Sequence, residues 1–220
     1  MFPFPFSFIG SAIVPDVPVE RIANAEAMSF NGTDQYINAG NDSSLSLTTE
    51  ITISCWVKPS TAITSQSFPV FVAKDINQVY MLYGNSSTGT FRLRIGTNIA
   101  ANVVDSTTVL PTGAWSHVTA TYDGSNMKVY YNGGLENTKS RTGNIPTSIQ
   151  DVNIARASNS TLYFTGDMDE VAIFNTALSA NKIQQIYDAT AVVGGVPQTA
   201  NLFTGGLSSS LVYWNRMGDS

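Results

Sequence analysis

The sequence predicts an all-β protein, built as a two-sheet antiparallel sandwich with one short helix near the C-terminal end and an extended arm at each terminus. Several short segments carry apolar residues at every second position, turn-forming residues separate these segments, and helical spacing appears only once. Charged residues make up 12% of the 220 residues, and Ser, Thr, Asn and Gly fill the gaps between apolar runs. This mixture is typical of many short strands joined by turns.

The chain begins with a predicted extended arm, residues 1–26. Residues 1–9 are strongly apolar, but prolines interrupt them and no basic residue precedes them. They therefore match a signal peptide poorly and are too short to span a membrane. Such an exposed apolar arm either folds back on its own domain or docks on a neighbouring subunit, and both alternatives stay open.

The predicted sandwich domain spans residues 27–188. Residues 91–95 alternate most clearly, with Phe91, Leu93 and Ile95 expected inside and Arg92 and Arg94 outside. The other predicted strands lie near residues 28–31, 36–37, 51–58, 68–74, 78–83, 115–122, 127–131 and 168–174. In the last of these, we expect Met168, Ala172 and Phe174 on one face and Val171 and Ile173 on the other.

One helix is predicted directly after this last strand. Ser179 can serve as its N-cap, and Leu178 can pack against Ile183. Ile183, Ile186 and Tyr187 follow at helical spacing, so one face of the helix has apolar residues to bury. We expect this helix to close an open end of the sandwich.

Four motifs occur in one order along the chain. They are MSFNGTDQY at residues 28–36, ITISCWVKP at 51–59, WSHVTATYDG at 115–124 leading to VYYNG at 129–133, and GDMDEVAIFN at 166–175 followed by ALS. Together they resemble the laminin-G-like, concanavalin A-like jelly rolls, and the resemblance covers about residues 27–188. It implies a jelly-roll fold, which serves many functions. Ala155 stands where this family usually has a turn glycine.

The last segment, residues 189–220, is predicted to be a glycine-rich linker and a strand-like tail. Its residues 211–219, LVYWNRMGD, resemble the strand that opens the same family's domain, but they stand at the other end of the chain. They are interpreted either as the start of a second copy or as a strand given to a neighbour.

Catalysis is not expected. Asp167, Asp169 and Glu170 resemble the clustered carboxylates of jelly-roll glycosidases, but strand alternation puts Glu170 on the other face from the two aspartates. His117 is the single histidine, and we expect it to be half exposed on its strand. Without a second histidine, and with Cys55 as the single cysteine, neither a zinc site nor a Cys/His nucleophile is predicted.

Two binding sites are candidates. The resemblance implies structural calcium held by Asp34, Asp167 and Asp169, with hydrogen-bonded carboxylates as the alternative. A carbohydrate site is predicted on residues that point to the side of their strands away from the core. The aromatic residues would stack on sugar rings, and the arginines would bind the polar groups of the sugar. These residues are Trp56, Arg92, Arg94 and Tyr130. The alternative is that they pack against other parts of the chain.

The net charge of −5 and the absence of a Lys/Arg cluster argue against binding to duplex nucleic acid, and one cysteine excludes an intramolecular disulfide. The predicted function is a non-enzymatic structural protein of the virion surface, in a capsid decoration or tail fibre. It would assemble through its arms as a homo-oligomer or with capsid and tail proteins. This hypothesis depends on the two apolar arms and on a chain that starts without a recognisable leader. The alternative is a carbohydrate-binding module of a secreted or surface bacterial protein.

Overall fold

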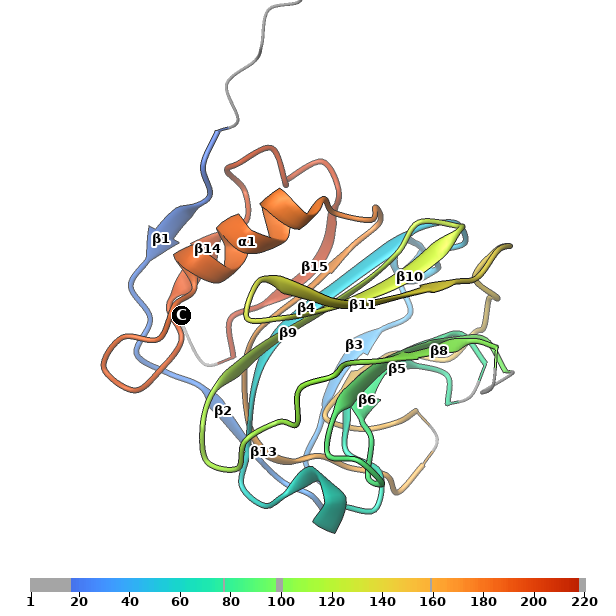
Figure 1. Ribbon diagram of the computed structural model, residues 1–220, viewed down its shortest axis with the longest axis horizontal. Coiled ribbons are helices and arrows are strands. Elements are labelled where there is room, and N and C mark those ends of the chain that lie inside the picture. Colours follow the sequence, from blue (N-terminus) through green and yellow to red (C-terminus); the bar gives the residue numbers. More distant parts are fainter. Residues whose placement is uncertain (1–16, 77, 98–100, 159, 218–220) are drawn as a thin grey trace, which may run out of the picture.

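The computed structural model describes residues 17–76, 78–97, 101–158 and 160–217, so the apolar segment of residues 1–9 lies outside the described residues. Two antiparallel sheets face each other, and the one α-helix among the described residues lies over the outer face of one of them (Figure 1). The predicted all-β sandwich with one short helix is confirmed. The helix falls well short of the length and apolar character needed to cross a membrane.

The first sheet has the strand order β11-β10-β9-β4-β13, and both β2 and β15 pair with the remaining edge of β13. Its strands are β2 (Met28–Asn31), β4 (Ile51–Pro59), β9 (Ser116–Tyr122), β10 (Asn126–Tyr131), β11 (Gly134–Ser140), β13 (Thr165–Phe174) and β15 (Leu211–Asn215).

The second sheet has the order β3-β12-β5-β6-β7-β8. Its strands are β3 (Ile37–Gly40), β5 (Val70–Lys74), β6 (Tyr80–Gly84), β7 (Phe91–Ile95), β8 (Val103–Asp105) and β12 (Val152–Ile154). Short 3₁₀ helices at Ser43–Leu45 and Ile63–Ser65 flank β4. A small two-stranded sheet joins β1 (Glu20–Ile22) to β14 (Thr199–Asn201).

The main core lies between the two sheets. It consists of the side chains that alternate toward the inner faces of the strands, as predicted. Ile53 and Val57 of β4 are fully buried there, as are Phe91, Leu93 and Ile95 of β7. Burying each of these side chains contributes roughly 1.5–3 kcal/mol, an upper estimate because unfolded chains already bury part of this surface. The core therefore holds the two sheets together without a disulfide, and Cys55 lies buried in it as a free thiol.

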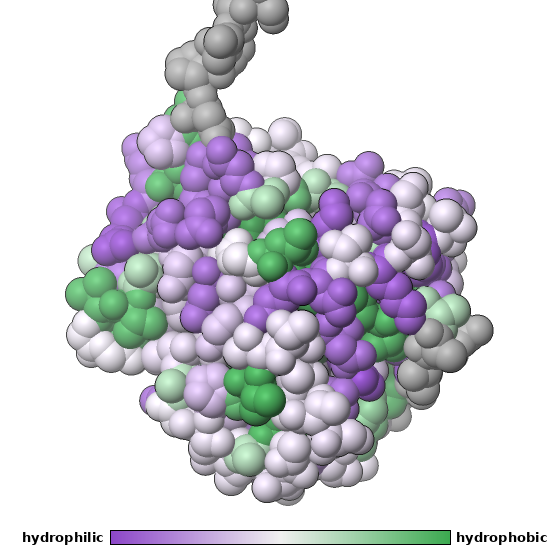
Figure 2. Space-filling model, in the orientation of Figure 1, coloured by the Kyte–Doolittle hydropathy of each residue, from purple (hydrophilic) through white to green (hydrophobic). Residues whose placement is uncertain are grey.

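The helix α1 (Ala180–Ala189) begins as the sequence predicts, because the hydroxyl of Ser179 accepts a hydrogen bond from the backbone N–H of Lys182. Its position differs from the prediction that it closes an end of the sandwich. Ile183 and Ile186 pack instead on Phe174 and other side chains of the outer face of the first sheet. A second apolar layer forms there, and the surface over α1 is largely hydrophilic (Figure 2).

The face assignment predicted for β13 is wrong. Glu170 adopts a left-handed backbone conformation, with φ of 49°, and the pairing of β13 with β4 shifts register there. This β-bulge adds a residue and inverts the alternation beyond it. Met168 therefore shares the inter-sheet core with Val171 and Ile173, while Phe174 faces α1.

The tail also folds differently from either interpretation of the sequence. Residues 211–215 form β15 and pair with β13 of the same chain, and β14 pairs with β1 near the start of the described residues. Since Leu211–Asn215 lie beside residues 171–174 and Met28–Asn31 beside residues 165–168, β15 and β2 lie end to end along one edge of β13.

Candidate functional site

The structure separates the four residues predicted to contact a carbohydrate. Trp56 and Tyr130 lie on the outer face of the first sheet, beneath α1, and are 3% and 2% exposed. The indole ring of Trp56 stacks on Tyr187 of the helix, with 5.8 Å between ring centroids. A sugar cannot reach either ring while α1 is in place.

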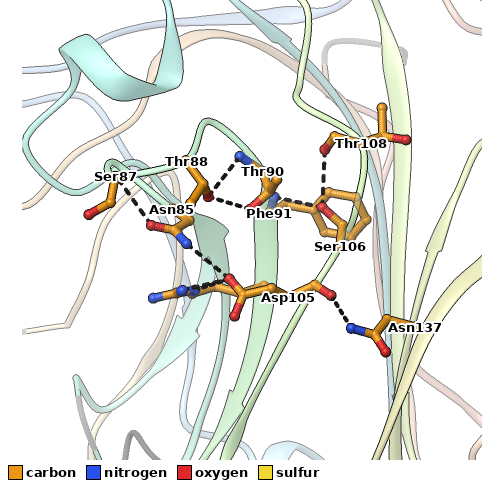
Figure 3. Close-up of polar contacts among 10 residues, drawn as sticks. Asn85, Ser87, Thr88, Thr90, Phe91, Asp105, Ser106, Thr108 and Asn137 are labelled. Carbon is orange, nitrogen blue, oxygen red and sulfur yellow. Dashed lines mark hydrogen bonds and ion pairs between the residues drawn. The ribbon is translucent and has the colours of Figure 1, made fainter.

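Arg92 lies on the outer face of the second sheet, on the opposite side of the sandwich. Its Nε donates to Asp105 at 2.7 Å, and the same carboxylate oxygen accepts from the side-chain amide of Asn85 at 3.0 Å. Figure 3 shows this polar network, in which the backbone carbonyl of Asp105 also accepts a hydrogen bond from Asn137. The guanidinium of Arg92 is thus held within the protein by an ion pair.

Arg94 lies on the same face and is 3% exposed. Its guanidinium donates to the backbone carbonyls of Gly96 and Thr97 at 3.0 and 2.7 Å. The outward direction of all four predicted residues was foreseeable from strand alternation. The covering helix and the internal partners of the arginines were not, because they depend on tertiary packing.

The three carboxylates predicted to bind calcium each have protein partners. Asp34 accepts from the side chain of Asn31 at 2.8 Å, Asp167 forms an ion pair with Lys58 at 3.1 Å, and Asp169 is buried. Throughout the part of the chain that the structure describes, no group of three or more His, Cys, Asp or Glu side chains is arranged to hold a metal ion. Calcium therefore stays a prediction from the family resemblance.

Two of the clustered carboxylates come together in a way that the sequence did not suggest. The bulge in β13 turns both Asp169 and Glu170 toward the terminal segments of the chain, where Asp169 accepts from Asn24 at 2.8 Å and Glu170 accepts from Thr199 at 2.6 Å. Asp169 is 0% and Glu170 is 5% exposed. This pair is shut off from solvent, so a polysaccharide has no access to it here.

His117 is 1% exposed, and the prediction that it is half exposed is wrong. It lies under α1, where its Nε2 is 2.8 Å from the hydroxyl of Ser54, and burial lowers its pKa to about 3. Among the described residues, neither His117 Nδ1 nor Trp56 Nε1 has a hydrogen-bond partner. With no carboxylate on Nδ1 and no opening to solvent, this Ser–His pair lacks the arrangement of an activated nucleophile.

An open groove of about 730 Å³ lies at another place, beside the outer face of the second sheet. It is lined by Ile76, which follows β5, and by residues of the segment between β12 and β13, namely Arg156, Ser160, Thr161 and Leu162. Ile76 and Leu162 pack against apolar residues on that outer face. The groove therefore combines an apolar floor with hydroxyl groups and a guanidinium.

Two tyrosine rings stand next to this groove. The guanidinium carbon of Arg156 is 3.6 Å from the centroid of the Tyr36 ring, and the rings of Tyr36 and Tyr163 are 6.5 Å apart. Tyr36 is 39% exposed. Apolar walls with a few polar groups and an accessible aromatic ring are typical of small-ligand and sugar sites. We call these residues, the groove lining with Tyr36 and Tyr163, the Arg156 groove.

The sequence did not identify the Arg156 groove. Ala155, at the position where the resembled family usually has a glycine, adopts φ of 63°, in the left-handed region that glycine favours. This conformation lies at the point where the chain leaves β12 and enters the groove segment. A turn at this point was thus foreseeable, but the side chains that meet across the groove were not.

Comparison with known proteins identifies the family of this chain. A family model described as the concanavalin A-like lectin/glucanases superfamily matches residues 31–184. None of the curated proteins matches the sequence. Among solved structures, a putative carbohydrate-binding protein from Bacteroides ovatus has a TM-score of 0.64 at 17% identity, over 92% of this chain and 53% of that one.

Two other solved structures cover most of both chains. Domain 4 of an extracellular arabinanase from Geobacillus stearothermophilus, solved with arabinotriose, has a TM-score of 0.59 at 20% identity, over 76% of this chain and 79% of that one. A heptameric pentraxin from Limulus polyphemus has a TM-score of 0.53 at 16% identity, over 84% and 92% of the two chains. At these identities the likeness establishes the fold alone. The match of the family model over most of the chain shows that the protein belongs to the concanavalin A-like lectin/glucanase superfamily.

Proposed function

We propose that this protein is a carbohydrate-binding module that acts outside the cell, and that it holds its glycan in the Arg156 groove. The observation that carries the proposal is the groove itself, where an apolar floor, two hydroxyl side chains and a guanidinium adjoin an exposed tyrosine ring. Sugar rings present apolar faces and polar edges, and this set of groups matches both.

The fold relatives support this choice over the virion hypothesis. The arabinanase domain was solved with arabinotriose. The cell entry of another fold relative, botulinum neurotoxin type C, depends on interaction with two ganglioside molecules. The chain spans only about half the length of several of these proteins, so their ligands indicate a ligand class and not a particular ligand. The setting in a virus particle stays a prediction, and the C-terminal strand that motivated it is paired within its own domain.

Binding without hydrolysis is the proposed mode of action. The carboxylates of β13 that resemble those of glycosidases are buried and hydrogen-bonded, away from the groove segment. The groove lining itself contains no carboxylate among its described residues. A sugar held there would therefore meet donors and an aromatic ring, but no acid and nucleophile pair.

A glycan array followed by calorimetry tests the proposal. The wild-type protein is expected to bind a subset of oligosaccharides, and Tyr36→Ala is expected to weaken binding by roughly 1–3 kcal/mol, by analogy with bases stacked on aromatic rings. Phe203→Ala is a matched control, because Phe203 is an aromatic residue that is 69% exposed and contacts Trp214 of β15 instead of the groove. Equal losses in both variants, or no glycan binding by the wild type, would contradict the proposal.

A further inference from the structure

Arg156 follows β12 and, unlike the arginines of β7, has no polar partner for its side chain among the described residues. Arg92 is paired with Asp105, and Arg94 donates to backbone carbonyls. Within the described ranges, the side chain of Arg156 forms no ion pair or hydrogen bond, and its guanidinium lies over the ring of Tyr36. Its Nε is buried without an acceptor, while the side chain as a whole is half-buried and lines the groove.

We propose that the Arg156 groove selects acidic glycans, in which a sugar carboxylate binds to the guanidinium of Arg156. This inference rests on the proposed function, because it names the ligand class of the same site. A carboxylate is the acceptor that best matches a guanidinium, since its two oxygens can take two parallel N–H donors.

The contact with Tyr36 orients this cation. Stacking against the face of the ring restrains the guanidinium while leaving its N–H edge available for hydrogen bonding. A restrained donor loses less conformational freedom on binding than a lysine or arginine that moves freely in solvent.

The negative charges around the groove favour a glycan with a single carboxylate at the site over a densely charged polyanionic glycan. Asp75 precedes Ile76 of the groove lining, and its carboxylate accepts a hydrogen bond from Ser148. Asp151 directly precedes β12, and its carboxylate accepts a hydrogen bond from Asn38. These carboxylates and the net charge of −5 oppose a polyanion, so a heavily sulfated glycan is a poor ligand for this site.

The test uses pairs of ligands that differ in one group. Uronic-acid and sialic-acid oligosaccharides are each compared with the same compound after reduction of the carboxyl group to an alcohol, by calorimetry at low and high NaCl concentration. The wild-type protein is expected to bind the acidic member of at least one pair about tenfold or more tightly, with a preference that shrinks in high salt.

Three variants assign this preference to a residue. Arg156→Gln is expected to bring the affinity for the acidic ligand down to that for its neutral partner, and Arg156→Lys to restore part of the difference. Arg216→Gln is the matched control, because Arg216 also lies over an aromatic ring, at 6.0 Å from Trp214, outside the groove. Each variant is first compared with the wild type by circular dichroism and thermal unfolding.

The possible failures are distinguishable. If the wild type binds acidic and reduced sugars equally, and Arg156→Gln does not change their ratio, the acidic specificity is wrong while the proposed function stands. If Arg216→Gln loses the preference as fully as Arg156→Gln, the effect is one of overall charge and the inference is wrong. If no oligosaccharide on the array binds to the folded wild type, the proposed function itself fails.

Discussion

The indole Nε1 of Trp214 donates a hydrogen bond to Oε2 of Glu170 at 3.2 Å, although 44 residues separate them in the chain. The other carboxylate oxygen of Glu170 accepts from Thr199 of β14. The bulge in β13 is therefore the point where two C-terminal strands are anchored to the sandwich. Glu170 is 5% exposed, so both of these donors help to satisfy a buried acceptor.

Replacing Trp214 with phenylalanine tests this anchor. Trp214→Phe keeps an aromatic ring but leaves one oxygen of a buried acceptor without this donor, so we expect the free energy of unfolding to fall by about 1–3 kcal/mol. Urea denaturation measures the change. Trp115→Phe is a matched control, because its indole donates at an exposed position to the carbonyl of Gly195. An equal or larger loss in the control would contradict the role of Glu170.

Removal of residues 207–220 is expected to destabilise the domain more than any single substitution in β15. The deletion leaves half of one edge of β13 unpaired and removes Leu207, Leu211 and Trp214 from the layer beneath α1. We expect a lower urea midpoint, and partial recovery when a peptide of residues 207–217 is added in trans. A scrambled peptide is the control. An unchanged midpoint after deletion would mean that β15 contributes nothing to stability.

The buried histidine predicts a loss of stability in mild acid. Burial lowers the pKa of His117 from its ordinary value of 6.5 to about 3, so the folded state excludes a proton that the unfolded state binds. The stabilisation is present above pH 6.5 and is lost as the pH falls toward 3, at about 1.4 kcal/mol per pH unit. Since the chain has one histidine, His117→Gln should flatten the profile between pH 6.5 and about 5. A wild-type profile as flat as that of the variant would contradict this account.

No hydrolytic activity is expected on polysaccharides. Asp169 accepts a hydrogen bond from Asn24, and Glu170 is held by Thr199 and Trp214, so both carboxylates already serve the fold. Incubation with a panel of β-glucans, galactans and arabinans, followed by a reducing-sugar assay, checks this expectation. Release of sugar that Asp169→Asn abolishes, in a variant that remains folded, would show that the protein is an enzyme.

The periodic parts of the fold were predictable from the sequence. Alternation in residues 91–95 placed Phe91, Leu93 and Ile95 in the core, and Ser179 marked the start of the helix. These features depend on local spacing and capping chemistry, which a sequence carries directly. The bulge at Glu170 was not predictable in this way, because a single residue in a left-handed conformation reverses the alternation without changing the composition.

The functional surface was predictable only in part. Outward-pointing residues such as Trp56 were identified correctly as lying off the inter-sheet core, yet the pattern does not say whether another element covers them. Here α1 covers Trp56, while Arg156 lies in an irregular segment that has no periodicity to interpret. Sites on such segments depend on which loops the fold brings together.

Chemical-shift mapping of a glycan that binds the protein tests the location of the site most directly. Titration of ¹⁵N-labelled protein with the best oligosaccharide from the array should shift the backbone amides of residues 156–158 and 160–163, together with those of Tyr36 and Ile76 around the same groove. Amides of β4 and α1, around Trp56 and Tyr187, should not move. Saturable shifts confined to β4, α1 or the β7–β8 edge would contradict the central claim that this protein binds carbohydrate in the Arg156 groove.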